Sequence, residues 1–269
     1  MPVRGNHTAG QRSRDITMKN AICAELYKLR HDRLLWFVPV LYAAMGLYSG
    51  FYEHEVMNTY RGLELFSLTE LAGLFLPFAV TTVTGYVTGG DFSRRTIQNA
   101  LSVGTNRKSY YFSRLLVQGL LTGALFLIVW LPHIVCHLIL PRGNTQVRIA
   151  FLVPKLLVYM AVLFLQLLAY VSVMNTVCYF VKKPLSAIVA GIILVYLEMI
   201  LRQAAALNGV GLIREIVRFS PANVIHGFFA YAYYDRVFTG EFLGYGVSAV
   251  LLILAGCAAG YGRFEYGGD

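Results

Sequence analysis

Two pairs of polar residues lie inside apolar stretches of this chain, at the spacing that shares one helix face. His133 and His137 are four residues apart and could bind a metal ion together. No third ligand follows at a suitable spacing, so we favour histidines that pack or hydrogen-bond. Glu198 and Arg202 are also four residues apart. They could line a substrate pathway or form an ion pair at the membrane surface, and the sequence leaves both interpretations open.

The chain lacks the motifs of common catalytic sites. Residues 104–109, GTNRKS, come closest to a phosphate-binding loop, but no glycine precedes the lysine. Neither HExxH nor GxSxG occurs. An enzyme would need His133, His137 and Glu198 to converge from different segments. We therefore expect no catalytic residue, metal or cofactor on this chain.

Hydroxyl side chains follow Pro77 in another apolar stretch. Thr81 and Thr84 could satisfy backbone carbonyls that the proline leaves without a donor, or they could line a pathway through the membrane. We favour the structural role.

The composition is that of a membrane protein. Hydrophobic residues make up 57% of the chain, charged residues 14%, and the mean hydropathy is +0.58, whereas soluble domains carry about 25% charged residues. A net charge of +9 could indicate nucleic-acid binding. The cations, however, lie in loops beside apolar runs, which the positive-inside rule explains more simply. We therefore expect no nucleic-acid partner.

Six apolar runs are each long enough to cross a bilayer. We expect an all-α, polytopic membrane domain over residues 34–269, with both termini in the cytoplasm. Residues 208–241, with Ser220-Pro221 as a helix start, are predicted to form external re-entrant helices before the last span. The six predicted spans are 34–51, 71–89, 115–140, 151–181, 185–207 and 242–261.

Two segments precede the first span. Residues 1–17 are polar, and we expect a flexible tail. Residues 18–33 have the pattern of an amphipathic helix in the membrane interface, with Lys28 and the neighbouring arginines near lipid headgroups. Lys28 and Asp32 are four residues apart and could pair weakly.

The longest polar break follows the second span, at residues 89–114. It predicts a short cytoplasmic helix over residues 92–102, capped by Asp91 or Ser93 and stopped by Gly104, with Asn106 capping the next helix. An apolar face and a polar surface suit docking onto a motor protein. The candidate contact residues are Asp91, Arg94, Arg95, Ile97, Asn99 and Leu101, together with Lys182 and Lys183 of a second cytoplasmic turn.

Three segments together resemble ABC transporter permeases of the type-2 exporter family. They are residues 24–30 (AELYKLR), residues 91–113 and Ser220-Pro221, and the likeness covers residues 18–263. It is nearest to small bacterial permeases for bacitracin, lantibiotic or drug resistance. The resemblance implies that residues 18–33 are a connecting helix and that the polar break holds the coupling helix. Asp91 stands where the family commonly has glutamate.

The resemblance also implies partners and a location. It predicts a separate ABC ATPase subunit that binds ATP and Mg, a second permease copy or relative, surrounding lipids and a bacterial plasma membrane. The exported substrate would be amphipathic: a peptide, a drug or a lipid-like molecule. The alternative is a membrane sensor or scaffold that transports nothing and binds a cytoplasmic regulator.

Overall fold

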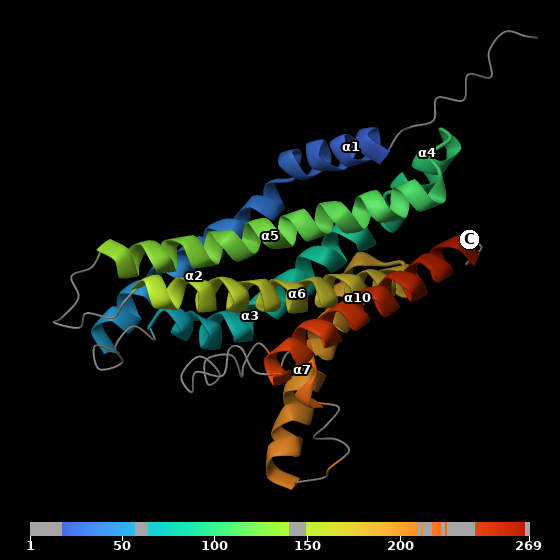
Figure 1. Ribbon diagram of the computed structural model, residues 1–269. Helices are drawn as coiled ribbons and strands as arrows, with labels where there is room; N and C mark the ends of the chain where they lie inside the picture. Colours follow the sequence, from blue (N-terminus) through green and yellow to red (C-terminus); the bar gives the residue numbers. More distant parts are fainter. Residues whose placement is uncertain are drawn as a thin grey trace, which may run out of the picture.

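The computed structural model describes residues 18–56, 64–139, 149–208, 211, 217–221, 224 and 240–266, and this part of the chain is helical without strands. The all-α class is therefore confirmed (Figure 1). The predicted tail at residues 1–17 and most of the predicted re-entrant region lie outside the described residues. The helices are α1 (Met18–His31), α2 (Arg33–Val56), α3 (Glu64–Ser93), α4 (Thr96–Ser102), α5 (Arg107–Ile139), α6 (Ile149–Val181), α7 (Pro184–Asn208) and α10 (Gly240–Tyr266).

Within the described residues, four helices are long and apolar enough to cross a membrane. Their apolar segments are Arg107–Cys136, Leu156–Val181, Pro184–Ala205 and Phe242–Tyr266, and they coincide with the predicted third to sixth spans. The first predicted span falls on α2, whose described apolar segment, Leu35–Tyr48, is shorter. The second falls within α3. The count of six spans therefore stays a prediction.

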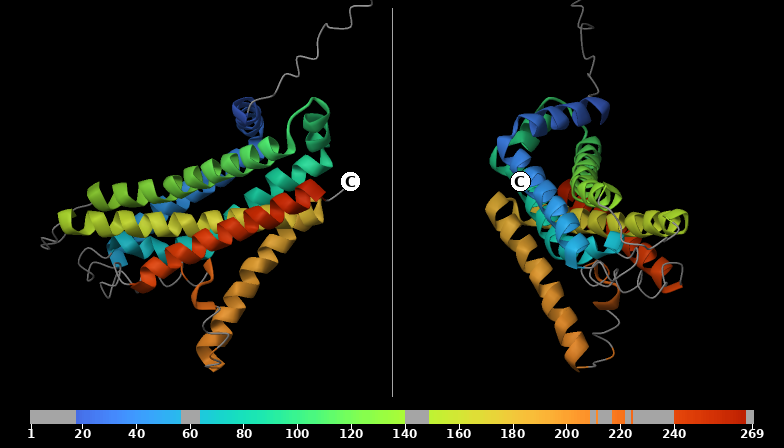
Figure 2. Two further views of the ribbon diagram at one scale, coloured as in Figure 1. Left: turned by 45° about the vertical axis from the view of Figure 1, so that its right-hand side comes forward. Right: turned by 90° about the vertical axis from the view of Figure 1, so that its left-hand side faces the viewer.

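The helices α3, α5 and α6 form the centre of the bundle. Leu76, Trp130, Tyr159, Leu163 and Leu167 are buried between them. α10 packs along α6, while α7 packs on α3 and diverges from the other helices along its length (Figures 1 and 2). Apolar side chains on the outer faces are exposed, for example Leu185 and Ile193 on α7, as expected for helices surrounded by lipid.

Polar side chains and glycine join α6 to α10. Ser172 and Thr176 of α6 donate hydrogen bonds to the carbonyls of Ile253 and Gly256 at 2.9 and 2.8 Å. A Cβ on Gly256 would lie 2.5 Å from the Ser172 hydroxyl oxygen. The absent side chain lets the two backbones approach closely, as small residues do between membrane helices.

A second close approach occurs where α3 passes the turn between α6 and α7. A Cβ on Gly89 would lie 2.6 Å from Cα of Pro184, whereas a Cβ on Gly90 would meet nothing within 4 Å. Gly89 therefore has no room for a side chain, whereas Gly90 has.

We expect Gly89→Ala to lower the thermal stability of the detergent-solubilised protein and Gly90→Ala to preserve or raise it. Both substitutions gain the helix propensity of alanine, but only Gly89→Ala forces a clash with backbone, which costs about 1–3 kcal/mol. Melting curves of the two variants in parallel provide the measurement. Equal melting temperatures would contradict the close approach of α3 to Pro184.

The polar face of α1 points into the protein. Glu25 is buried and Lys28 is half-buried, whereas Leu26 is 44% exposed. Lys28 pairs with the buried carboxylate of Asp91 on α3. Its predicted weak pairing with Asp32 and its placement near lipid headgroups stay predictions. Asp32 accepts a hydrogen bond from the Tyr86 hydroxyl at 3.0 Å.

Candidate coupling site

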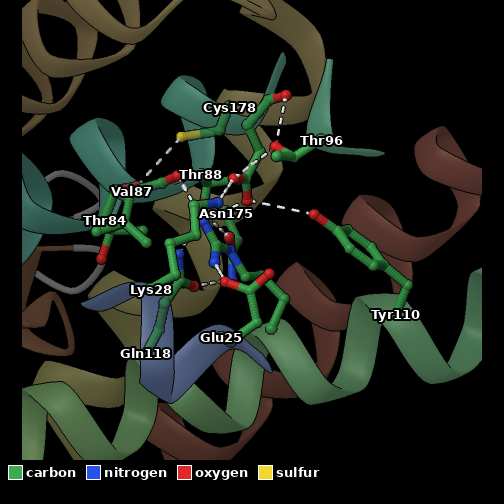
Figure 3. Close-up of polar contacts among 12 residues, drawn as sticks. Glu25, Lys28, Thr84, Val87, Thr88, Thr96, Tyr110, Gln118, Asn175 and Cys178 are labelled. Carbon is green, nitrogen blue, oxygen red and sulfur yellow. Dashed lines mark hydrogen bonds and ion pairs between the residues drawn. The ribbon is translucent and has the colours of Figure 1, made fainter. Parts of the chain in front are cut away.

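The end of α3 carries a buried carboxylate on which three helices converge. Asp91 is 1% exposed. It pairs with Lys28 of α1 and with Arg114 of α5. The hydroxyls of Thr96 and Tyr110 donate to its two oxygens at 2.9 and 3.2 Å. Figure 3 shows Lys28, Thr96 and Tyr110 pointing toward one another at this place.

Arg114 extends the contacts of Asp91 to a second carboxylate. It is fully buried, pairs with Glu25 of α1 and donates to the carbonyl of Val87. Two cations therefore face two carboxylates. A buried charge is tolerated when it is paired and hydrogen-bonded, and this set is balanced. We call Glu25, Lys28, Asp91 and Arg114 the ion-pair network; it ties α1, α3 and α5 together.

Three amide and hydroxyl side chains form a closed ring beside this network. Thr88 donates to the Asn175 side-chain oxygen at 2.9 Å, Asn175 donates to Gln118, and Gln118 donates back to Thr88. All three residues are buried, and they come from α3, α6 and α5. Because each finds its partners inside the ring, the ring fixes the register of the three helices.

α4 starts later than predicted. α3 continues to Ser93, and Arg95 turns the chain at the N-cap with φ 54° and no side-chain cap. The expected cap by Asp91 or Ser93 is therefore wrong, since Asp91 accepts from the hydroxyl of Thr96. The short helix spans Thr96–Ser102 rather than residues 92–102.

The end of α4 follows the sequence prediction. Gly104 has φ 95°, and the N–H groups of Gly104 and Thr105 donate to the carbonyls of Leu101 and Ala100. These two bonds form a Schellman motif. Asn106 then caps α5 by accepting from the N–H of Lys108 at 2.9 Å, as predicted.

One face of α4 is seated on the protein's own aromatic side chains. Ile97 is buried against Tyr110, Tyr111, Tyr179 and Phe264. Leu101 is half-buried and packs against the same group. The side chains on the open side of this segment are exposed; they are Arg94, Arg95, Gln98, Asn99, Ser102 and Val103. These residues, rather than Ile97, are accessible to a partner.

A pocket of about 460 Å³ lies beside α4. The side chains of Arg95, Arg107, Lys182 and Arg263 line it, together with Asp91 and aromatic residues. Lys183, the other residue of the predicted second cytoplasmic contact, is exposed and outside this lining. We call this the basic pocket.

The predicted pathway residues occupy different places. Glu198 accepts a hydrogen bond from the Tyr170 hydroxyl and lines a second pocket of about 470 Å³ between α6, α7 and α10. Arg202, one turn further along α7, is half-buried. Thr81 and Thr84 are buried in α3, and the Thr81 hydroxyl donates to the carbonyl of Pro77 at 2.9 Å. A pathway role for these residues stays a prediction.

The described residues form no group of three or more His, Cys, Asp and Glu side chains that could hold a metal ion. His133 is fully buried, and its ring meets Trp130 edge to face. The side chain of His137 lies outside the described residues.

The sequence interpretation missed Glu25 and Arg114 as partners across helices. Arg114 carried one usable signal: it is a cation at the very start of a predicted span, where an unpaired charge would be costly.

A comparison with protein-family models finds one that matches residues 21–198, the family described as ABC-2 family transporter protein. No curated protein matches the chain. The matched region contains most of α1, the ion-pair network, α4 and most of α7. Because it covers about two thirds of the sequence, the chain belongs to the ABC-2 family of transporter proteins.

Proposed function

We propose that this chain, a permease of the ABC-2 family, couples ATP hydrolysis by a separate ABC ATPase subunit to the export of an amphipathic substrate. ATP and Mg bind to that ATPase. The substrate is a peptide, drug or lipid-like molecule, as the resemblance to bacterial resistance permeases suggests. The chain works in a bacterial plasma membrane with six spans, both termini in the cytoplasm and a second permease.

The observation that carries the proposal is the rigid attachment of α4 to the neighbouring helices. A helix that transmits force must be rigid and rigidly attached. α4 is closed by a Schellman motif, seated through Ile97 and followed at once by capped α5. Asp91, five residues before it, is held by Lys28 and Arg114. A push on α4 therefore reaches α1, α3 and α5 together.

The exposed side of α4 gives the partner its contacts. Arg94 and Asn99 offer a charge and an amide whose polar contacts would align α4 with the ATPase. Val103 offers an apolar side chain that is 68% exposed. When two ATPase subunits close on ATP, a groove that holds this side would displace α4. The displacement would tilt α3 and α5 against α6 and open the membrane domain alternately to its two sides.

We expect a tagged chain, purified gently from its native membrane, to carry an ABC ATPase in about equal amount. The measurement is subunit identity and stoichiometry by mass spectrometry, followed by ATP hydrolysis. A preparation that holds no ATPase under several mild detergents would contradict the proposal and favour the sensor or scaffold.

A further inference from the structure

The basic pocket has a composition that the coupling function does not explain. Its lining combines the cationic side chains of Arg95, Arg107, Lys182 and Arg263 with the rings of Phe92, Tyr179 and Phe264. The pocket lies between one side of α4, which contributes Ile97, Gln98 and Leu101, and the ends of α3, α6 and α10 with the start of α5.

The pocket is strongly positive. Its single acidic residue, Asp91, is already paired with Lys28 and Arg114. One of the cations is also held in place. Arg107 donates to the carbonyls of Phe264 and Glu265 at 3.3 and 3.0 Å. Those bonds leave the guanidinium its charge, and the pocket keeps an excess of positive charge.

Two of the cationic residues adopt an unfavourable backbone conformation. Arg95 has φ 54° and Lys182 has φ 57°, and among the described residues no other residue except glycine has a positive φ. Glycine would fit such a turn at less cost. The two strained residues lie on separate loops, yet both line this pocket. Strain of this kind concentrates at binding sites.

Each of three pocket cations has a cationic neighbour in the sequence that lies outside the lining. The pairs are Arg94 and Arg95, Arg107 and Lys108, and Lys182 and Lys183. General attraction to an acidic surface would use both members of each pair. The pocket gathers one member of each pair around one volume, which indicates a site for a discrete anion.

The position of the pocket indicates the source of that anion. The ends of α5, α6 and α10 that border it are ends of helices apolar enough to cross a membrane. With these helices placed across a membrane as proposed above, the pocket would lie at the level of the lipid headgroups. Basic pockets between membrane helices on the cytoplasmic side bind anionic headgroups, and the aromatic and aliphatic lining suits the glycerol and first methylenes.

We propose that the basic pocket binds the phosphate headgroup of an anionic phospholipid. The proposal rests on the membrane placement given under the proposed function. The lipid would fill the space between α4 and the ends of α6 and α10, and its phosphate would meet Arg95, Lys182 and Arg263.

The test uses the full-length chain, purified with whatever subunits accompany it and then depleted of lipid. Native mass spectrometry counts bound phosphatidylglycerol, phosphatidylcholine or inorganic phosphate across a titration. We expect one tightly held phosphatidylglycerol per chain, with phosphatidylcholine and inorganic phosphate at least about tenfold weaker. Equal binding of the two lipids, or of inorganic phosphate alone, would overturn the proposal.

Paired variants separate the site from general surface charge. Arg95→Gln with Lys182→Gln should weaken phosphatidylglycerol binding about fivefold per cation, or about 25-fold together. Arg94→Gln with Lys183→Gln removes the same charge from neighbouring positions and should leave binding nearly unchanged. Equal losses in both double variants would overturn the proposal.

A third variant guards against loss through misfolding. Lys182→Gly removes the cation but suits the backbone, so melting temperature should hold or rise while lipid affinity falls about fivefold. Unchanged affinity would overturn the proposal. Co-purification of the ATPase is scored separately, so lipid binding and the coupling function can fail independently.

Discussion

Arg114→Met should destabilise the protein by about 3–5 kcal/mol, because the substitution removes the cationic partner of buried Glu25 and one of the two cations that pair with buried Asp91. Arg114 is 1% exposed and pairs with both Glu25 and Asp91. Methionine fills much of the same volume but brings no charge. Lys28 still neutralises Asp91, which leaves Glu25 as the group with the greatest loss.

Thermal melting and urea sensitivity in detergent measure this loss. Lys108→Met is the matched control, since Lys108 is an exposed cation on the same helix and surface substitutions usually stay within about 0.5 kcal/mol. Adding Glu25→Gln to Arg114→Met should recover part of the stability by removing the stranded charge. An Arg114→Met protein as stable as the control would refute the ion-pair network.

The sequence predicted the helical architecture because apolar runs are a local property. The predicted third to sixth spans coincide with α5, α6, α7 and α10. The end of α4 and the start of α5 were predictable for the same reason, because Gly104 and Asn106 form their capping hydrogen bonds with residues close in sequence. Such signals need no knowledge of distant parts of the chain.

The ion-pair network was not predictable in this way. Lys28 and Asp91 are 63 residues apart and Glu25 and Arg114 are 89 apart. An amphipathic pattern on α1 identifies a charged face but does not say whether water or an oppositely charged helix covers it. The predicted start of α4 was wrong for a related reason. Arg95 adopts a left-handed conformation that arginine has no intrinsic tendency to adopt.

Arg94→Glu combined with Val103→Asp should uncouple ATP hydrolysis from the membrane domain while leaving its fold intact. Both residues are exposed on the open side of the α4 segment. Reversing a charge and placing another on an apolar tip would remove contacts of the kind that dominate interfaces, each worth about 2 kcal/mol or more. We expect at least a tenfold loss of ATPase co-purification or of substrate-stimulated hydrolysis.

Leu101→Asp would be a weaker test of the same contact. Leu101 packs against the aromatic residues that hold Ile97, so its loss would unseat α4 as well as remove a docking group. Lys108→Glu provides the control, because it reverses an exposed charge on α5 just outside α4. The Arg94→Glu, Val103→Asp variant should have the same melting temperature as the unaltered protein. If it also keeps full stimulated hydrolysis, the exposed side of α4 is not where the motor binds, and the rigid mounting of α4 serves the membrane fold alone.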